Sequence, residues 1–291
     1  MTNARAAIAP TRIGGRLFEW GSRTFVMGIV NVTPDSFSGD GLLASIAGRR
    51  GAAVEAAVMQ ARRMVEEGAD ILDVGGESTR PGHEPVPESE EIARVVPVVT
   101  AMHAALPDVP ISVDTSKPAV AAAAIDAGAV LLNDVWGVSL DDAVARVAAT
   151  RRVPLILMHN RAEPVYRDLV AEVLSDLRAA LDRAMAAGVP RDNLIVDPGF
   201  GFGKTPEHNL LILRELSALH VLGRPILLGT SRKSTLGRVL GGVPPQERLD
   251  ATLATTALGI AAGVDIVRVH DVRANVQVAR VSDAVVRGVS V

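Results

Sequence analysis

Asp, Asn, Lys, Arg and His side chains stand at the ends of apolar runs along this 291-residue sequence. Side chains at the ends of neighbouring parallel strands converge, and catalytic groups of α/β proteins commonly lie there. A single Asp in such a place more often caps the following helix. Eight polar run ends exceed what hydration of a rim requires, so together they predict a ligand site. These residues are Asn31, Asp73, Asp114, Asn133, Asp134, His159, Asn160, Asp197, Ser231, Lys233, Arg268 and His270.

The spacing within the runs predicts which way these side chains face. Residues two apart in a strand point to the same side, so Arg268 and His270 are expected together, as are Ser112 and Asp114. Asp accepts from adjacent N–H groups, and Asn133 can both donate and accept. This set suits a flat heterocycle rich in N–H groups and ring nitrogens.

The segment GTSRKSTLG (229–237) has the composition of an anion-binding turn. A glycine and small hydroxyl residues precede a predicted helix, whose first N–H groups are free to donate to an anion. Lys233 can also donate to ring or carboxylate oxygens. The alternative for Lys233 is an ordinary solvated cation.

The run DPGFGFGKT (197–205) superficially matches a phosphate-binding loop. That motif requires glycine at position 198, where this chain has Pro198, so the match fails. We interpret the run as a tight loop in which Phe200 or Phe202 forms a wall of the site.

Two early loops, Asn31–Gly41 and Gly75–His83, are rich in Gly, Pro, Ser and Thr. Such composition is typical of segments that close over a substrate. Asp35, Thr79 and Arg80 are candidates to meet a second substrate or a metal-bound pyrophosphate. Ordinary turn chemistry is the alternative for these loops.

The elements that position these residues alternate between short apolar runs and alanine-rich helical segments. Nearly continuous apolar runs bounded by Gly or Pro suit strands that are buried on both faces. Eight β–α units predict a single (β/α)8 barrel over residues 25–291, with a doubly wound open sheet as the rival. Residues 1–24 form an extension, in which GGRLFEWGSRTF predicts a hairpin over the bottom of the barrel. The predicted strands are Phe25–Val32, Ala69–Glu77, Pro110–Thr115, Ala129–Val135, Pro154–His159, Leu194–Gly199, Pro225–Ser231 and Asp265–Val272.

The composition excludes several classes of function. Cysteine is absent, which excludes disulfides, thiolate zinc sites and thiol nucleophiles. The net charge of −3 gives no electrostatic case for nucleic acid or a membrane as a partner. No run is long enough for a signal peptide or a membrane span, so we expect a cytoplasmic protein.

Several of these strings, taken in order, resemble dihydropteroate synthases. They are NVTPDSFS after the first strand, GGESTRPG after the second, DPGFGFGK, SRKS and RVHDV, with SVDT, LLNDV and LMH between them. The resemblance extends from about Trp20 to the C-terminus. One departure is Gly39-Asp40-Gly41, where many members have Asp-Gly-Gly, and it affects the metal contact of the first loop.

The resemblance implies a condensation of dihydropterin pyrophosphate with para-aminobenzoate, Mg²⁺ as cofactor and a homodimer. It implies catalytic roles for Asp114, Lys233, Arg268 and His270. Asn31 would contact Mg²⁺ and pyrophosphate. The full implied sets are Asp114, Asn133, Met158, Asp197, Phe202 and Lys233 for the pterin; Asn31, Arg80, Arg268 and His270 for pyrophosphate; and Phe37, Thr79, Arg80, Pro81, Lys233 and Ser234 for para-aminobenzoate.

Two other functions share the barrel and its pterin residues. One is a pterin-binding methyltransferase that uses methyltetrahydrofolate, and the other is a non-catalytic paralogue that only binds pterin. The early loops and the SRKS and RVHD strings favour the synthase over both, because a pyrophosphate-releasing enzyme needs them.

Overall fold

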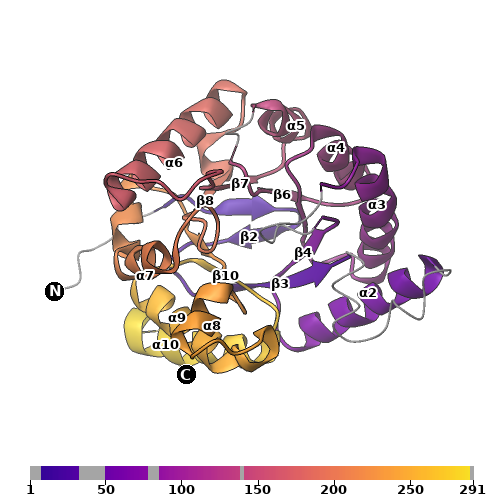
Figure 1. Cartoon of the computed structure of the whole chain (residues 1–291). Coiled ribbons are helices and arrows are strands. Elements are labelled where there is room, and N and C mark those ends of the chain that lie inside the picture. Colours follow the sequence, from indigo (N-terminus) through magenta and orange to yellow (C-terminus); the bar gives the residue numbers. More distant parts are fainter. Residues whose placement is uncertain (1–7, 33–49, 78–84, 138–140, 289–291) are drawn as a thin grey trace.

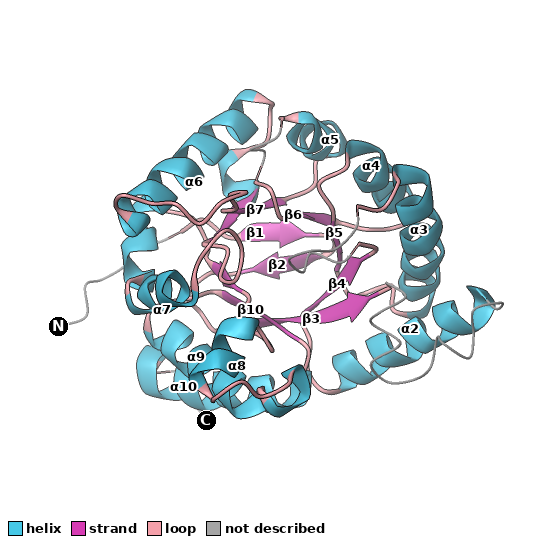
Figure 2. Ribbon diagram, viewed as in Figure 1, coloured by secondary structure: helices cyan, strands magenta, loops and turns pink. Residues whose placement is uncertain are grey.

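Short, buried apolar runs form the strands of a parallel barrel in the computed structural model, which describes residues 8–32, 50–77, 85–137 and 141–288. Each of the eight predicted runs contains one strand, so the predicted barrel is confirmed (Figures 1 and 2). The strands are β3 (Phe25–Asn31), β4 (Ile71–Gly75), β5 (Ile111–Asp114), β6 (Leu131–Asp134), β7 (Leu155–Met158), β8 (Leu194–Asp197), β9 (Leu227–Leu228) and β10 (Ile266–Val269).

The strands follow the order β8-β7-β6-β5-β4-β3-β10-β9. A parallel bridge between Val196 and Ile226 joins the two ends of this sheet and closes the barrel. Closure removes the exposed sheet edges. It also brings the carboxyl ends of all the strands to one rim, where the candidate residues stand.

Helices surround the barrel in the order of the sequence (Figure 1). Their buried sides are rich in Ala and Val, which allow close packing against the outward-facing residues of the strands. The helices are α2 (Arg50–Glu66), α3 (Glu88–Ala105), α4 (Pro118–Asp126), α5 (Ala143–Arg151), α6 (Leu169–Ala186), α7 (Pro206–Arg214), α8 (Ser234–Val239), α9 (Leu249–Ala261) and α10 (Val272–Arg287), with short 3-10 turns at Arg191–Asn193, Leu216–Leu222 and Pro245–Glu247.

The interior of the barrel changes from apolar to polar along several of its strands. Alternation directs every second residue inward. Near the amino ends of most strands the inward residues form one apolar cluster. Two positions further along, the inward residue is Asp73 on β4, Asn133 on β6, Asp197 on β8 and Arg268 on β10. The apolar floor therefore supports a polar layer. The floor residues are Phe25, Met27, Ile71, Leu131, Ile156, Ile195, Leu227 and Ile266.

The predicted N-terminal hairpin is confirmed, with strands β1 (Thr11–Ile13) and β2 (Arg16–Phe18). Ile13 and Phe18 pack into the apolar floor, and the Phe18 and Phe25 ring centroids lie 4.7 Å apart. Burial of a side chain of this size contributes roughly 2–3 kcal/mol. The hairpin thus closes the end of the barrel opposite the polar layer.

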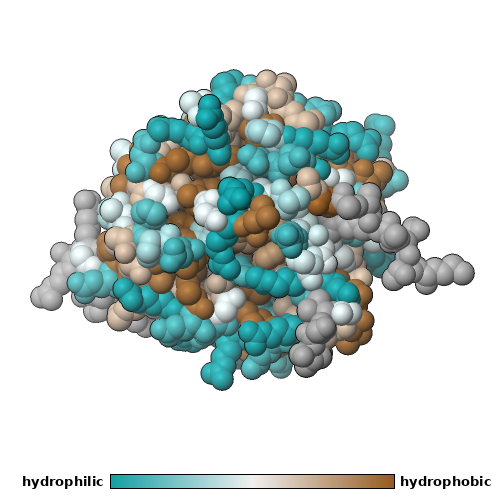
Figure 3. Space-filling view, turned by 180° about the vertical axis from the view of Figure 1, so that it is seen from behind, coloured by the Kyte–Doolittle hydropathy of each residue, from teal (hydrophilic) through white to brown (hydrophobic). Residues whose placement is uncertain are grey.

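The surface is mixed in character. Hydrophobic residues lie scattered among hydrophilic ones on the face seen from behind in Figure 3. Within the part of the chain that the structure describes, no helix has the length and apolar content needed to cross a membrane.

Candidate active site

Arg268 lies at the centre of the polar layer and binds two carboxylates. Its Nε donates to Oδ2 of Asp73 at 2.6 Å, and its Nη2 donates to Oδ2 of Asp114 at 2.7 Å. Nδ2 of Asn133 also donates to Oδ2 of Asp73, at 3.1 Å. The side chain of Asp73 is fully buried. One cation therefore binds two acids inside the barrel.

Three oxygen atoms in this layer are buried and have no hydrogen-bond partner among the described residues. They are Oδ1 of Asp73, Oδ1 of Asp114 and Oγ of Ser112. An unpaired buried acceptor costs roughly 1–3 kcal/mol, so such atoms favour a ligand or a water that donates to them. Asp114 stands at the rim end of its strand, which makes its free oxygen the one nearest the mouth.

Burial raises the pKa of the two rim carboxyl groups. The pKa of Asp114 is raised to about 7, because desolvation and the nearby Asp73 outweigh the attraction of Arg268 and Lys233. The pKa of Asp197 is raised to about 6 by desolvation, although the N–H of Gly199 donates to its Oδ1 at 2.7 Å. Both groups therefore exchange protons close to neutral pH.

Lys233 reaches this layer from the turn between β9 and α8. Its Nζ lies 3.8 Å from the centre of the Phe202 ring, a cation–π contact. The preceding Arg232 has a left-handed backbone, with φ 58°, which is strained for a residue other than glycine. Two bonds from its guanidinium to Asp271, at 3.0 and 2.7 Å, hold this turn.

His270 follows β10 and is neutral. The hydroxyl of Ser231 accepts from the backbone N–H of His270 at 3.1 Å and lies 2.9 Å from its Nδ1, to which it can donate. Burial, with Arg232 and Arg268 nearby, lowers the pKa of His270 to about 3. The proton of the neutral ring is then on Nε2, which can donate to an anion.

The structure brings most of the predicted pterin residues together. Asp114 and Asn133 are neighbours in register on β5 and β6. Electrostatic interaction links Lys233 to both Asp114 and Asp197. Of the two aromatic candidates, Phe202 contacts Lys233, whereas Phe200 is part of the hydrophobic core.

Three other predicted positions are less central. Asn31 is the last residue of β3, and its Oδ1 lies against Gly75, as does the Cβ of Asp114. A Cβ built on Gly75 would be 3.6 Å from the Asn31 oxygen and 3.7 Å from the Asp114 carbon. Met158 ends β7 and is 4% exposed, and it also lines a separate cavity of about 290 Å³ beside α6. Ser234 begins α8 next to Lys233. The predicted loop residues Phe37, Thr79, Arg80 and Pro81 lie outside the described residues.

Asp73 and Ser231 belong to the predicted set of polar run ends, but the sequence indicates no individual role for either. Asp73 lies two positions after Ile71, which faces the barrel interior, so the alternation along β4 predicts that Asp73 faces inward as well. Nothing in the sequence indicated that Ser231 would bind the imidazole of His270, since 39 positions separate them. Arg268 was predicted to bind pyrophosphate, and the structure places its guanidinium among the predicted pterin residues.

Comparison with known proteins identifies the family of this site. The sequence model described as "Pterin binding enzyme" matches residues 27–270. The dihydropteroate synthase of Clostridium beijerinckii is 48% identical over 277 residues, covering 95% of this chain and 99% of that protein. The chain belongs to the dihydropteroate synthases. The family predicted from the sequence is confirmed, and the chain is a transferase of folate biosynthesis.

Solved structures of dihydropteroate synthases share the fold. The Clostridium difficile enzyme, in the presence of pteroic acid, is 46% identical, with a TM-score of 0.86, over 93% of this chain and 99% of that one. The Xanthomonas albilineans enzyme with 4-aminobenzoic acid is 43% identical, with a TM-score of 0.88, over 96% and 98%. The similarity therefore covers nearly the whole chain, in sequence as well as in fold.

Proposed function

We propose that this chain condenses 6-hydroxymethyl-7,8-dihydropterin pyrophosphate with para-aminobenzoate, giving 7,8-dihydropteroate and pyrophosphate. The observation that carries the proposal is the buried set of Asp114, Asn133 and Asp197 at the barrel mouth, which the half-buried Lys233 faces, with Oδ1 of Asp114 unpaired among the described residues. Pteroic acid and 4-aminobenzoic acid, the ligands of the similar structures, support the same pair of substrates.

The pterin ring is the ligand that suits the polar layer. Its adjacent N–H groups match carboxylate acceptors on Asp114 and Asp197, and its ring nitrogens and oxygen match donors on Asn133 and Lys233. Phe202 gives the pocket an aromatic wall. Because Asp114 and Asp197 are buried, an analogue that lacks a matching donor would leave an acceptor unpaired, which penalises it strongly.

His270 and Arg268 are the proposed pyrophosphate donors. The Nε2 proton of neutral His270 is suited to a phosphate oxygen. The bonds to Asp73 and Asp114 use Nε and Nη2 of Arg268, which leaves its Nη1 to donate to the leaving group. The charged guanidinium of Arg268 and the neutral imidazole of His270 would both donate to the negative charge that grows on pyrophosphate as it departs.

Para-aminobenzoate is proposed to lie over Lys233 and Ser234, with Phe37, Thr79, Arg80 and Pro81 of the early loops. The Lys233 ammonium, next to the start of α8, suits a carboxylate or a ring face. The arylamine is uncharged at neutral pH and needs no strong base. The contribution of the protein is therefore alignment of the amine with the methylene carbon and stabilisation of the leaving group.

Mg²⁺ is the proposed cofactor, and Asn31 is the described residue that would hold it. Among the described residues there is no cluster of three His, Asp or Glu side chains that could ligate a metal. A single amide oxygen nevertheless fits this ion, which retains several waters and binds mainly through substrate phosphates. When bound, Mg²⁺ would neutralise charge on the pyrophosphate.

Product formation tests the proposal. Purified protein should release pyrophosphate and form dihydropteroate when both substrates are present, and neither substrate alone should give product. Arg268→Ala and Asp114→Ala should each lose most of the turnover, and near-normal rates in either variant would refute these roles. Methyl transfer from methyltetrahydrofolate, or pterin binding without product, would identify the methyltransferase or the non-catalytic alternative.

A homodimer is proposed from the family resemblance and from exposed apolar side chains on α9 and α10, two helices that pack against each other. Leu258 of α9 and Val281 and Val285 of α10 are 62%, 67% and 80% exposed. Such side chains are commonly covered by a partner subunit. Light scattering should give twice the chain mass for the unmodified protein and the mass of one chain for the double variant Val281→Arg/Val285→Arg.

A cytoplasmic location, and the lack of nucleic-acid or membrane partners, stay predictions of the sequence.

A further inference from the structure

The loop after β8 packs between His159, at the end of β7, and Lys233. Gly199 and Gly201 adopt φ values of +69° and +85°, which only glycine readily takes. A Cβ on Gly199 would lie 1.8 Å from the carbonyl oxygen of His159, and one on Gly201 would lie 3.0 Å from Cδ of Lys233. The loop therefore contacts the end of β7 on one side and Lys233 on the other.

Lys204 holds this loop in its folded form. Its Nζ donates to the carbonyl oxygens of Gly199 and Phe202, both at 3.1 Å, and to Nδ1 of His159 at 2.8 Å. These three acceptors match the three N–H groups of an ammonium. Burial lowers the pKa of Lys204 to about 7, and the three acceptors favour its ammonium form.

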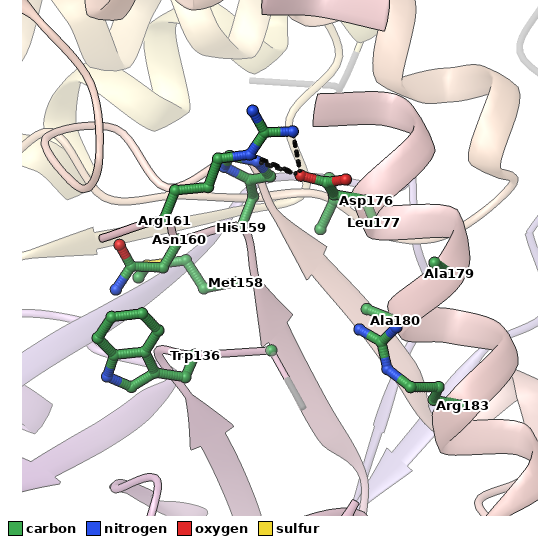
Figure 4. A pocket seen from close by; sticks show the side chains of 11 residues that line it. Trp136, Met158, His159, Asn160, Arg161, Asp176, Leu177, Ala179, Ala180 and Arg183 are labelled. Carbon is green, nitrogen blue, oxygen red and sulfur yellow. Dashed lines mark hydrogen bonds and ion pairs between the residues drawn. The ribbon is translucent and has the colours of Figure 1, made fainter. Parts of the chain in front are cut away.

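His159 is itself fixed from the other side. Its Nε2 lies 3.1 Å from Oδ2 of Asp176, and the same oxygen accepts from Arg161 at 3.0 and 2.8 Å (Figure 4). The side chain of His159 is only 1% exposed. A ring nitrogen that faces a carboxylate carries the proton, so Nδ1 is the acceptor for Lys204. Burial and the Lys204 cation lower the pKa of His159 to about 3, which keeps the ring neutral.

The loop held by Lys204 places the ring of Phe202 against Lys233. Phe202, whose carbonyl Lys204 binds, places its ring 3.8 Å from Nζ of Lys233. We propose that Lys204, held by His159 and Asp176, is a positioning residue that sets the side chain of Lys233 in the pterin site through Phe202. This inference rests on the proposed role of Lys233 in binding substrate.

The three lysines of this chain, Lys117, Lys204 and Lys233, allow a direct test. Protein labelled with ¹³C at the lysine Cε should give three NMR signals, and the ring current of Phe202 should shift the protons of Lys233. Lys117→Arg identifies one signal, and Phe202→Leu removes the ring shift. Lys204→Met should remove its own signal and move that of Lys233 toward the position of unshifted lysine. It should also weaken pteroate binding, measured by calorimetry, about tenfold.

A pair of His159 variants provides a second test should Lys204→Met fail to fold. Asn retains an oxygen that can accept from Lys204, whereas Leu does not. His159→Leu should therefore move the Lys233 signal as Lys204→Met does, and His159→Asn should stay nearer to the unmodified protein. Equal shifts in both variants would overturn the inference.

Tyr166→Phe is the matched control. It removes the hydrogen bond from the Tyr166 hydroxyl to the carbonyl oxygen of Gly203, at 2.7 Å in the same loop, and leaves the bonds of Lys204 intact. The Lys233 signal should stay in place. A shift as large as that of Lys204→Met would mean general loosening of the loop and would refute the inference, as would an unmoved Lys233 signal in folded Lys204→Met. The NMR signal requires no substrate, so absence of product in the unmodified protein would count against the proposed function alone.

Discussion

Nε of Arg268 on β10 lies 2.6 Å from Oδ2 of Asp73 on β4, across 195 positions of sequence. Between these strands runs β3, which pairs with both. The long guanidinium spans this gap inside the barrel, and its Nη2 also binds Asp114 on β5. The bond thus connects the last strand of the barrel to the part of the site that the early strands build.

Asp73→Ala should destabilise the protein strongly. It leaves Nε of Arg268 and Nδ2 of Asn133 without their shared acceptor, and each unpaired buried donor costs about 1–3 kcal/mol. The free energy of unfolding, measured with denaturant, checks this. Arg63→Gln is the control, because Arg63 is 79% exposed in its ion pair with Glu67 and should cost less than about 1 kcal/mol. Similar losses in the two variants would contradict the prediction.

Gly201→Ala should impair pterin binding by displacing Lys233. The added Cβ would lie 3.0 Å from Cδ of Lys233, in a backbone with φ +85°. Gly241→Ala is the matched control, since its φ is +81° and nothing lies within 4 Å of the added atom. Both should lose about 1 kcal/mol of stability through backbone strain. Only Gly201→Ala should weaken pteroate binding, about tenfold by calorimetry, and equal affinities would contradict this.

The strands could be predicted because runs buried on both faces have a simple sequence pattern. Asp114 and Asn133 could be placed at the rim for the same reason, since alternation alone directs them inward. The shortest strand shows the limit of the pattern. The sequence predicts a strand over Pro225–Ser231, whereas β9 covers only Leu227–Leu228, with Ile226 adding an isolated bridge to Val196. After β9 the chain turns, and the N–H of Lys233 donates to the carbonyl oxygen of Thr230.

The partners of the charged groups could not be predicted from the sequence. Whether Arg268 meets Asp73, Asp114 or a ligand depends on the stagger between strands and on the reach of a flexible side chain. The partners of Lys204 could not be predicted either, although they are close in sequence. The carbonyl groups that Lys204 binds face it only because the glycines of the same loop adopt positive φ.

Phe18→Ala should lower stability without altering catalysis. Phe18 is 1% exposed in the apolar floor of the barrel, and removal of a buried Phe costs about 3–5 kcal/mol. The hairpin lies at the end of the barrel opposite the polar layer, so kcat measured well below the melting temperature should stay near normal. Leu17→Ala, at a side chain 50% exposed, should change neither property. A large fall in kcat for Phe18→Ala would show that the hairpin affects the site.

Pterin affinity should fall as the pH is lowered through 7 and then 6. The pKa of Asp114 is raised to about 7 and that of Asp197 to about 6, chiefly by burial. An ionised carboxylate accepts at both oxygens and more strongly than the protonated group, whose O–H can only donate toward a pterin N–H, so tight binding favours loss of each proton. Pteroate affinity by calorimetry should therefore be full at pH 8 and decline about tenfold per pH unit for each group once the pH lies below its pKa. Binding at pH 6 should release protons into the buffer.

Asp197→Asn is the control for this pH dependence. It should bind more weakly at pH 8, with a shallower decline, because one of the two titrating groups is gone. A raised pKa also means that the ligand-free protein binds these protons more tightly than the unfolded chain does. The contribution of the two groups to stability is thus largest below pH 3.8, the ordinary value, and is lost as the pH rises toward 7. Affinity that is flat from pH 5.5 to 8, with no proton release, would contradict the proposed carboxylate–pterin contacts.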